Sequence, residues 1–453
     1  MKSMSQLQYH FGAKYRWYPS DTQKQVVKVN ADVRRAFYNH LIANKRKLGW
    51  IIHTSYWNGD LKRKIIANYK HTLHESVVRK RISWLRDKYI DSLNFAKTNQ
   101  SNNLAYKNHA SGLQGQPQFH RKKDHPYEWK YQTSRITWKS KGKRKSNIYF
   151  TDNRHLVLPV LGRITLGTTR KMPDDTLIGT VTIYKDATDK FWVSLQLASD
   201  TPFKSYQPQT HSAIGIDLNI CNSLMDNYGH QVSNPKFYTH GLPYLKFLQQ
   251  RENRRRRYAK SHHINLTVDK GYQRARKRCA KYYGYIKNER RAFLDRISTR
   301  LIENHDLIVA ENLKSSNILR NHKIAQKASD CGWREFLSML QYKAKLYGKT
   351  VILVNPAYTT QKCSHCGFVC TKHNGYAKKH GKHLDLDDRY WWCPICHTYH
   401  IRDRNAAVNI LRRGQKEILV KQRQNLIRLK RKRTPQELDS RPNLTFEFHR
   451  AAE

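Results

Sequence analysis

The sequence predicts an α+β protein of several domains, and three features of the 453-residue chain indicate this. Apolar residues recur at helical spacing near the amino end and over long stretches of the second half. Short segments of alternating apolar and polar residues, typical of antiparallel strands, fill the region from about 127 to 197. Two Cys-x-x-Cys pairs follow near the carboxyl end. With 38% hydrophobic residues, the chain can build two or three modest cores rather than one large core.

Positive charge dominates the composition. Lys and Arg number 85 against 34 Asp and Glu, which gives a formal net charge of +51. The basic residues are spread along the chain, and this favours binding to nucleic acid over a merely solvated basic surface. The amino terminus lacks the apolar core of a signal peptide, and no apolar run reaches membrane-spanning length. We therefore expect a cytoplasmic protein with no membrane partner.

The first hundred or so residues predict one strand and then helices. Positions 7–17 mix aromatic and polar residues like an edge strand, and Ser20 with Gln23 forms a capping box that opens a helix. Helical patterning continues from about 58 to 98, whereas residues 99–116 are rich in Asn, Gly, Ser and Gln and predict a loop. The apolar stripe of the first helix consists of Val26, Val29, Val33, Phe37 and Leu41.

The alternating segments between 127 and 197 predict a small antiparallel β-barrel, because turn residues separate short strands at regular intervals. The expected strands are 148–150, 155–158, 163–166, 180–184 and 191–197. In the second half, a long helical pattern runs from about 242 to 305. It contains 17 Lys or Arg and four acids between Arg251 and Arg300.

Two carboxylates end apolar strands in the second half. Asp217 follows Ala213-Ile-Gly-Ile, and Glu311 follows Leu307-Ile-Val-Ala. Such runs suit strands buried on both faces of a sheet, where an ionised carboxylate is costly unless something offsets its desolvation. Each acid could instead face solvent at a strand end. Asp403 precedes an apolar helical run, where an Asp ordinarily caps the helix or stabilises its dipole.

If these three carboxylates meet in space, they could hold two Mg²⁺ ions in a phosphodiesterase centre. Mg²⁺ is a hard ion that takes oxygen ligands and leaves positions open for water and phosphate.

The cysteine pairs predict a zinc site. Cys363 and Cys366 form one pair and Cys393 and Cys396 the other, and each two-residue gap lets a tight turn present both sulfurs to one ion. The alternative is two pairs of free or disulfide-bonded thiols, which the absence of a secretory signal disfavours. The histidines of this region, His400 among them, are expected to face solvent or nucleic acid, because four thiolates already complete the zinc shell.

These motifs together resemble a known family. Ile-Gly-Ile-Asp217, Val-Ala-Glu311-Asn-Leu and Arg-Asp403-Arg-Asn-Ala-Ala-Val-Asn, with the cysteine pairs before the third, are similar to the split RuvC nuclease of transposon-encoded TnpB proteins and of compact type V CRISPR nucleases. Trp333-Arg-Glu-Phe-Leu337 and Pro356-Ala-Tyr-Thr-Thr-Gln361 support the likeness. The resemblance covers nearly the whole chain, most sharply from about 212 to 411, and all three acids of the family's pattern are present.

The resemblance implies a domain plan. Residues 1–19 and 118–205 would form a wedge β-barrel, interrupted by a helical recognition domain at 20–117. Residues 206–355 would form an RNase H-like RuvC nuclease domain that includes the basic helical segment 242–305. A zinc-ribbon insert that binds target nucleic acid would occupy 356–399, the final RuvC helix 400–413, and a basic, partly disordered tail 414–453.

The resemblance also implies an activity. A guide RNA would direct one chain to double-stranded DNA beside a short flanking motif, and a single RuvC site would cleave the DNA. Asp217, Glu311 and Asp403 would hold two Mg²⁺ ions, and the four cysteines one structural Zn²⁺. A catalytically silent RNA-guided repressor or transposition regulator is the alternative, and an unguided nuclease with a zinc ribbon is a third reading.

Nucleic-acid contacts are expected at two places. Four arginines in one helical turn cover every side of the helix, which fits phosphate contact better than an amphipathic surface helix does, and the family places RNA or the guide–target hybrid there. A second group, by the same resemblance, would face the flanking motif. The first group is Arg254, Arg255, Arg256 and Arg257, and the second is Ser76, Arg79, Lys80, Arg121, Lys122 and Lys123.

Overall fold

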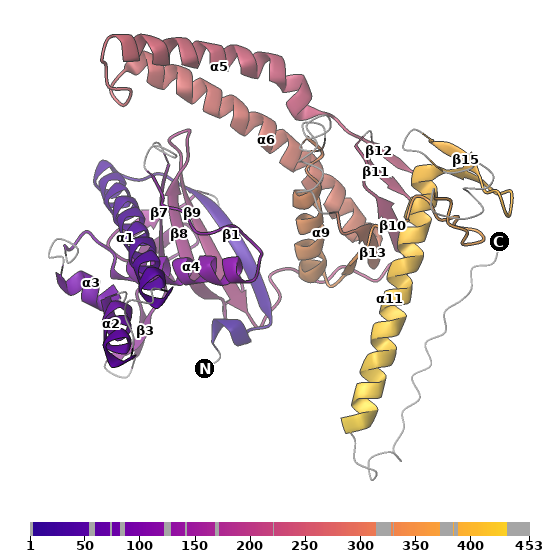
Figure 1. Ribbon diagram of the computed structural model, residues 1–453, viewed down its shortest axis with the longest axis horizontal. Helices are drawn as coiled ribbons and strands as arrows, with labels where there is room; N and C mark the ends of the chain where they lie inside the picture. Colours follow the sequence, from indigo (N-terminus) through magenta and orange to yellow (C-terminus); the bar gives the residue numbers. More distant parts are fainter. Residues whose placement is uncertain are drawn as a thin grey trace. The chain divides into compact units, whose positions relative to one another are not determined.

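The computed structural model describes residues 3–53, 59–72, 75–81, 87–121, 128–140, 143–167, 172–220, 222–313, 328, 330–371, 384 and 388–432. The chain forms two compact units (Figure 1). Unit 1 comprises Met1–Ser205 with Leu248–Tyr282, and unit 2 comprises Tyr206–Phe247 with Tyr283–Glu453. Both units mix helices and strands, so the predicted α+β class is confirmed. Within these ranges no helix combines the length and apolar composition needed to cross a membrane.

A four-stranded antiparallel sheet in the order β1-β9-β8-β2 forms the frame of unit 1. β1 lies at its edge, as predicted, and pairs along its whole length with β9. The strands of unit 1 are β1 (Tyr9–Trp17), β2 (Trp129–Ser134), β3 (Thr137–Ser140), β4 (Lys143–Ser146), β5 (Tyr149–Phe150), β6 (His155–Leu158), β7 (Gly162–Thr165), β8 (Leu177–Lys185) and β9 (Phe191–Ser199).

The predicted barrel does not close among the described strands. Strands β5, β6 and β7 form a separate three-stranded sheet, and β3 pairs only with β4. Leu156 and Ile164 of the small sheet share one apolar core with Val181 and Val193 of the large sheet. An isolated bridge between Trp17 and Leu166 links the large sheet to the chain after β7. Strands this short cannot extend a hydrogen-bonded ladder around the core, so packing of side chains joins the two sheets instead.

Among the described residues between β1 and β2, the helices are α1 (Asp21–His53), α2 (Gly59–Thr72), α3 (Glu75–Arg81) and α4 (Ser92–Ala110). The capping box of α1 is confirmed, because the Ser20 amide donates to Gln23 Oε1 at 3.0 Å and the Gln23 amide to Ser20 Oγ at 3.2 Å. The apolar stripe is buried except for Val29. Asn30 takes the buried position instead and donates to the carbonyls of Val26 and Tyr89.

The predicted loop at 99–116 is wrong for residues 99–110, because α4 continues to Ala110, and right for residues 111–116, which form no helix or strand. The Asp91 side chain caps this helix by accepting from the Leu93 amide at 2.9 Å. Phe95 packs edge-on against Phe37 of α1, with the ring centroids 5.1 Å apart. Burial against α1 and a good cap therefore outweigh the low helix propensity of the Asn- and Ser-rich sequence.

The helical pattern at 242–305 is interrupted, giving α5 (Phe237–Ser261) and α6 (Lys270–Asn304). Between them, His263 has a positive φ of 52°, and the Asn265 side chain accepts from the Thr267 amide in a turn. Asp269 then accepts from the Tyr272 amide at the start of α6. Local turn and capping bonds of this kind compete with a continuous helix, which explains the break.

A five-stranded mixed sheet in the order β12-β11-β10-β13-β14 forms the frame of unit 2. The central strands β10, β13 and β14 are parallel, and β11 and β12 form an antiparallel hairpin. Besides α5 and α6, the described part of unit 2 contains β10 (Ala213–Asp217), β11 (Asn222–Asp226), β12 (Gln231–Ser233), β13 (Leu307–Glu311), α9 (Trp333–Tyr347), β14 (Thr350–Val354), β15 (Tyr390–Trp392), β16 (Tyr399–Ile401) and α11 (Arg402–Lys432).

Helices cover both faces of this sheet (Figure 1). Ile216 and Ala310 point to the face where α9 and α6 supply Leu340 and Ile302. On the other face Val309 packs against Ile410 of α11. Because side chains alternate along a strand, each buried run serves two cores, which is why both runs are apolar throughout. α11 extends to Lys432, beyond the expected helix end at 413, and residues 433–453 lie outside the described residues.

Two glycines let α11 cross β10 and β13 at close range. A Cβ atom placed on Gly215 would lie 2.2 Å from the Ala407 carbonyl oxygen, and one placed on Gly414 would lie 2.5 Å from methyl groups of Val309. Side chains at either position would force the helix away from the sheet.

We expect Gly215→Ala to lower the free energy of unfolding of unit 2 by about 1–3 kcal/mol, the range for overpacked cores. Gly284→Ala is the matched control, because its Cβ would meet nothing within 4 Å in the interior of α6. That change should raise stability by about 1 kcal/mol through helix propensity. Denaturant unfolding monitored by circular dichroism measures both, and equal effects of the two changes would contradict the close crossing.

Candidate active site and metal sites

Asp217 and Glu311 lie side by side at the carboxyl edge of the sheet. Ile216 is opposite Ala310 in the parallel pairing of β10 with β13, so the next residue of each strand carries a carboxylate. Neighbouring strands are about 4.8 Å apart, and residues in register point to the same face. That face is the one crossed by α11, because Gly215 and Asp217 share it. Both acids are nearly fully buried.

Asp403 reaches the same place from the first turn of α11. Ala407, which touches Gly215, is one helical turn after Asp403, so the helix carries the third carboxylate toward the ends of β10 and β13. The Asn219 side chain, two residues beyond Asp217, donates to Asp403 Oδ2 at 3.2 Å. The structure thus brings together the three acids that the sequence singles out; we call them the acid centre.

The electrostatics of the acid centre oppose full ionisation without a cation. Burial raises the pKa of Asp217 well above its usual range, and the negative charges of Glu311 and Asp403 raise it further, against a smaller opposing effect of Arg402. Burial also raises the pKa of Glu311, although a short hydrogen bond from the Thr359 hydroxyl and the charge of Arg413 act in the other direction.

Two arginines form ion pairs with the acid centre, and both pairs are with Asp403. Arg402 Nε lies 3.2 Å from Asp403 Oδ1, and Arg389 Nη1 lies 3.6 Å from Asp403 Oδ2. Asp217 has no such pair among the ion pairs of the described residues, and it feels the positive charge of Arg402 only as an effect smaller than those of burial and the two neighbouring acids.

The oxygen-only donor set of the acid centre fits hard cations such as Mg²⁺. Within the described ranges, the four cysteines form the one group in which at least three ligand atoms lie within 4.8 Å of one another, so the carboxylate oxygens are more widely spaced. By the chemistry of their donor atoms, the residues present fit hard divalent cations, and the number of ions stays a prediction.

The cysteine cluster (Cys363, Cys366, Cys393 and Cys396) has the geometry of a tetrahedral thiolate site. The Cys363 and Cys396 sulfurs are 3.6 Å apart, and the Cys366 and Cys393 sulfurs 3.5 Å apart. Zn–S bonds of about 2.3 Å imply sulfur separations of roughly 3.8 Å around one ion, whereas a disulfide would need about 2.05 Å. The spacing fits zinc, and zinc binding stays a prediction.

Two asparagines attach the cysteine cluster to the helix that carries Asp403. The Asn405 side chain accepts from the Ser364 amide at 2.8 Å and donates to the Lys362 carbonyl at 2.8 Å. Asn409, one helical turn later, donates to the carbonyls of Thr359 at 2.9 Å and Lys362 at 2.6 Å. We call this pair the asparagine clamp. Because these bonds are buried, loss of either side chain would leave backbone groups without partners.

His400 does not face solvent or nucleic acid as expected. It is buried, its Nε2 lies 3.1 Å from Cys363 Sγ, and its ring packs on Trp391 at a centroid distance of 4.7 Å. It occupies the inner side of the β15–β16 hairpin, where alternation along a strand turns every second side chain toward the cysteine cluster.

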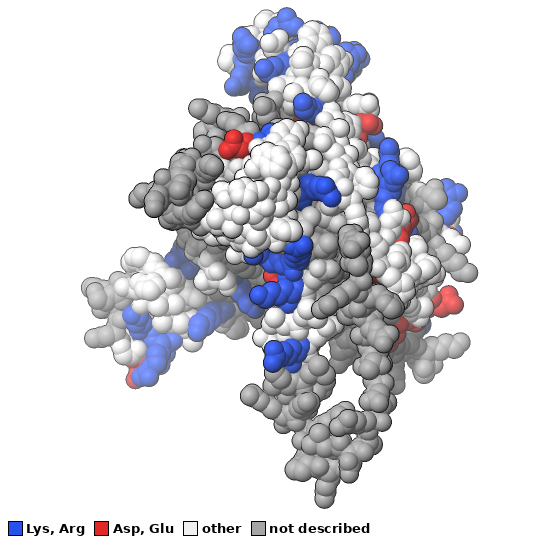
Figure 2. Space-filling model, turned by 90° about the vertical axis from the view of Figure 1, so that its right-hand side faces the viewer, with Lys and Arg blue, Asp and Glu red and all other residues white. Residues whose placement is uncertain are grey.

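The arginines of α5 divide into two groups. Arg254 and Arg255 line a hollow of 610 Å³ in unit 1, and Arg251, Arg274 and Arg278 line it too, with no Asp or Glu among its lining residues. In contrast, Arg256 donates to Glu252 at 3.0 Å and lies beside the Tyr272 ring. The face in Figure 2 likewise shows many more Lys and Arg than Asp and Glu. A hollow lined by cations suits a phosphate.

The second expected nucleic-acid group is only partly described. Ser76 and Lys80 are exposed on α3, and Arg121 is exposed after α4. The Arg79 side chain, Lys122 and Lys123 lie outside the described residues.

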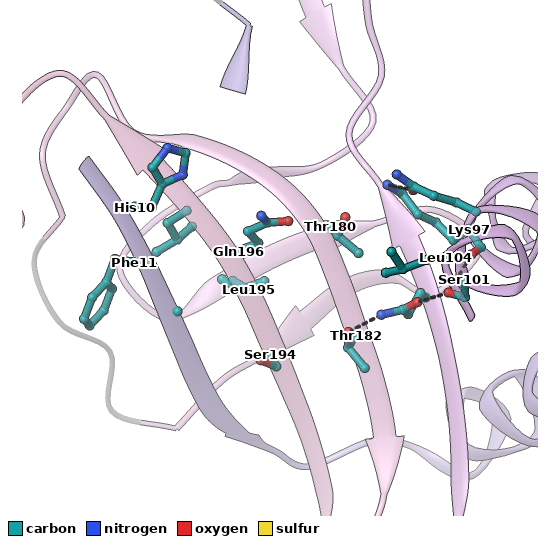
Figure 3. A pocket seen from close by; sticks show the side chains of 14 residues that line it. His10, Phe11, Lys97, Ser101, Leu104, Thr180, Thr182, Ser194, Leu195 and Gln196 are labelled. Carbon is teal, nitrogen blue, oxygen red and sulfur yellow. Dashed lines mark hydrogen bonds between the residues drawn. The ribbon is translucent and has the colours of Figure 1, made fainter. Parts of the chain in front are cut away.

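A polar hollow of 530 Å³ lies on the outer face of the unit 1 sheet, beside α4 (Figure 3). Gln132 donates to Thr182 at 3.1 Å, and Ser101 donates to Gln132 at 3.5 Å. Its lining offers hydroxyl and amide groups, His10 and Lys97 beside apolar side chains, with no Asp or Glu.

Comparison with known proteins finds similar chains over most of this sequence. A family model described as "Cas12f1-like, TNB domain" matches residues 333–410, and one described as "Probable transposase" matches 194–322. A Streptomyces pristinaespiralis protein named as an RNA-guided DNA endonuclease is 27% identical over 403 residues, which cover 88% of each chain. The TnpB-like protein L79 of Acanthamoeba polyphaga mimivirus is 28% identical over 142 residues, 30% of this chain and 25% of its own. The resemblance to TnpB proteins is confirmed.

InsQ of Escherichia coli K12, also named as an RNA-guided DNA endonuclease, is 23% identical over 278 residues, which cover 58% of this chain and 63% of InsQ. Among solved structures, a Cas12f1 complex with guide RNA and target DNA is 13% identical, covers 89% of this chain and 98% of its own, and has a TM-score of 0.44.

The sequence analysis singled out none of four residues that contact the acid centre: Asn219, Thr359, Arg389 and Arg402. It also gave no role to Asn405 and Asn409, which bind the backbone beside the first cysteine pair. One signal was available, because Asn405 and Asn409 are four residues apart and thus share a helix face. Their backbone partners could not be read from the sequence.

We expect Asp217→Asn to stabilise the metal-free protein at neutral pH. The pKa of Asp217 is raised above its ordinary value of 3.8, so the unfolded chain releases this proton first, and the free energy of unfolding falls as the pH rises through that interval. Removing the charge should raise the free energy of unfolding by on the order of 1 kcal/mol or more, since a pKa shift of one unit corresponds to about 1.4 kcal/mol. Thermal unfolding with a chelator measures this, and added Mg²⁺ should stabilise the parent but not the variant.

Asp306→Asn is the matched control for that experiment. Partial burial acts to raise the pKa of Asp306, but hydrogen bonds from Lys349, Thr210 and His211 hold it below its ordinary value. The ionised Asp306 carboxylate therefore stabilises the fold at neutral pH, and this stabilisation is lost on acidification. Asp306→Asn should accordingly lower the free energy of unfolding at neutral pH. The same sign for both variants would contradict the electrostatic account.

A double change, Arg254→Ala with Arg255→Ala, should weaken RNA binding and reduce the slope of log affinity against log salt by about two, one for each phosphate contact. Arg256→Ala should leave the slope nearly unchanged, because Glu252 and Tyr272 already engage that side chain. Filter binding over a salt series measures the slopes. Equal slopes for parent and double variant would show that RNA does not occupy the hollow.

Proposed function

We propose that this protein is an RNA-guided DNA endonuclease that cleaves DNA at one RuvC-type site. The observation that carries the proposal is the convergence of Asp217, Glu311 and Asp403, which are far apart in the chain, at one buried edge of the unit 2 sheet. The confirmed resemblance to TnpB proteins and the names of the relatives support guidance by RNA and DNA as the target.

Each residue of the acid centre has a part in the proposed reaction. Asp217, Glu311 and Asp403 would hold two Mg²⁺ ions. When bound, such ions lower the pKa of an attacking water and stabilise the leaving 3′ oxygen. Thr359 orients the Glu311 carboxylate through its hydroxyl, and Asn219 orients that of Asp403. Arg389 and Arg402 place positive charge beside Asp403, where a phosphate would enter.

The remaining assignments extend the same proposal. The four cysteines hold one structural Zn²⁺. The order of domains inferred from the resemblance applies, with a wedge of two packed sheets in place of a closed barrel and a last RuvC helix that continues to Lys432. One chain binds one guide RNA and reads a short motif beside its double-stranded target. The +51 net charge and the arginine-lined hollow of unit 1 support the nucleic-acid partners.

The decisive experiment uses the protein purified with its co-expressed RNA. With Mg²⁺, it is given a plasmid library that carries the matched target flanked by randomised bases. We expect cleavage next to one flanking motif only. Asp217→Ala should reduce cleavage by at least a thousandfold and leave RNA-dependent DNA binding nearly intact, because the carboxylate acts on metal rather than on DNA.

The other outcomes identify the alternatives. If the parent protein binds DNA beside one motif but does not cut it, it is a silent RNA-guided repressor. If it nicks DNA without RNA, it is an unguided nuclease. Loss of DNA binding by the Asp217→Ala variant would mean that the carboxylate is structural.

A further inference from the structure

The β15–β16 hairpin carries apolar side chains on both faces, and its two faces differ in what covers them. Trp391 and His400 point inward and pack against the core of the cysteine cluster. On the outer face, Tyr390 is 63% exposed, Trp392 67%, Tyr399 48% and Ile401 39%. We call these four residues the aromatic ladder. Large apolar groups gathered on one exposed face, unlike scattered ones, indicate a binding surface.

The ladder has a regular geometry. Tyr390 is opposite Ile401, and Trp392 is opposite Tyr399. The Tyr390 and Tyr399 rings are parallel within 1° at a centroid distance of 6.2 Å, and the Trp392 and Tyr399 rings are 5.1 Å apart. Two residues of an antiparallel strand span about 7 Å, which suffices for one or two bases laid along the hairpin.

One end of the ladder meets the acid centre. The Arg402 amide donates to the Arg389 carbonyl at 2.9 Å, directly after Ile401 and before Tyr390, and both arginine side chains contact the Asp403 carboxylate. A strand whose phosphate lies at the acid centre would therefore have its neighbouring bases over the exposed rings. The sequence analysis assigned the insert as a whole to target nucleic acid, without saying which of its residues bind or whether they take a single strand or a duplex.

We propose that the aromatic ladder is a stacking platform for unpaired bases of the DNA strand that enters the acid centre, an inference that rests on the proposed function. Stacking requires exposed base faces, which a duplex covers and a single strand offers. Every base has such a face, so the platform holds the strand without reading its sequence. The arginines at the end of the hairpin and the net charge of +51 favour a polyanion over an apolar partner.

The test measures binding by the full-length, RNA-bound protein without Mg²⁺, so that cleavage plays no part. The probes are a fluorescent oligodeoxythymidine and a hairpin duplex with the same number of phosphates, at a salt concentration that suppresses phosphate contacts. Trp392→Ala should weaken binding of the single strand about tenfold or more and leave the duplex unchanged. Trp392→Phe should restore most of the loss, and Trp392→Ala with Tyr399→Ala should add to it.

Tyr342→Ala is the matched control, because Tyr342 is 46% exposed on α9 of the same unit. Photocrosslinking of 5-iodouracil in the oligonucleotide should label peptides that contain residues 390–401 of the parent and spare them in the double variant. Zinc content equal to that of the parent shows that the insert is intact. The proposal would be overturned if Trp392→Ala left the affinity for the oligonucleotide unchanged, or if it weakened binding of the single strand and of the duplex equally. A molecular mass in light scattering that differs between the variant and the parent protein would overturn it too.

The outcomes separate this inference from the proposed function. A protein that binds single strands through the ladder yet cuts no RNA-matched target would retain the platform and lose the endonuclease assignment. If the protein cuts its RNA-matched target but the ladder variants do not change DNA binding, the endonuclease assignment stands and the stacking platform is wrong.

Discussion

The close crossing of α11 over β10 and β13 is the constraint on which the rest of unit 2 depends. Gly215 and Gly414 allow it, and one helix then carries three groups at fixed spacing. Asp403 completes the acid centre from its first turn. The asparagine clamp follows within two turns and holds the segment before and within the first cysteine pair. Because all are on one rigid helix, a shift of α11 would displace the acid centre and the cysteine cluster together.

Charge is arranged in opposite senses at the surface and in the interior. The chain has a net charge of +51, yet the acid centre gathers three buried carboxylates, and the two arginines that form ion pairs with it both do so through Asp403. A positive exterior draws a polyanion to the protein over long distances. A buried negative centre binds metal cations, and the strand can be held there only when such cations offset the repulsion of its phosphates. The two features therefore serve successive steps of the proposed reaction.

The sequence could predict what strong local patterns specify. Apolar runs ending in Asp217 and Glu311 become neighbouring parallel strands, and the cysteine spacing becomes a compact cluster of sulfurs. It could not predict features decided by tertiary partners. α4 forms through residues that looked like a loop because Phe95 packs on Phe37 and Asp91 caps the helix. Likewise, the asparagine clamp binds backbone carbonyls and amides, which leave no trace in residue identity.

The exposed aromatic ladder follows from the way in which the insert is held together. A two-stranded hairpin is at best marginally stable alone, and here the cysteine cluster with Trp391 and Cys370 forms a core of very few buried residues. Coordination of zinc by four thiolates would supply the folding free energy that so small a core lacks. Large rings on the outer face are then not needed for stability and cost solubility, so their retention beside Asp403 is best explained by a binding role. The same metal that orders the insert would thus orient the rings that contact the DNA strand.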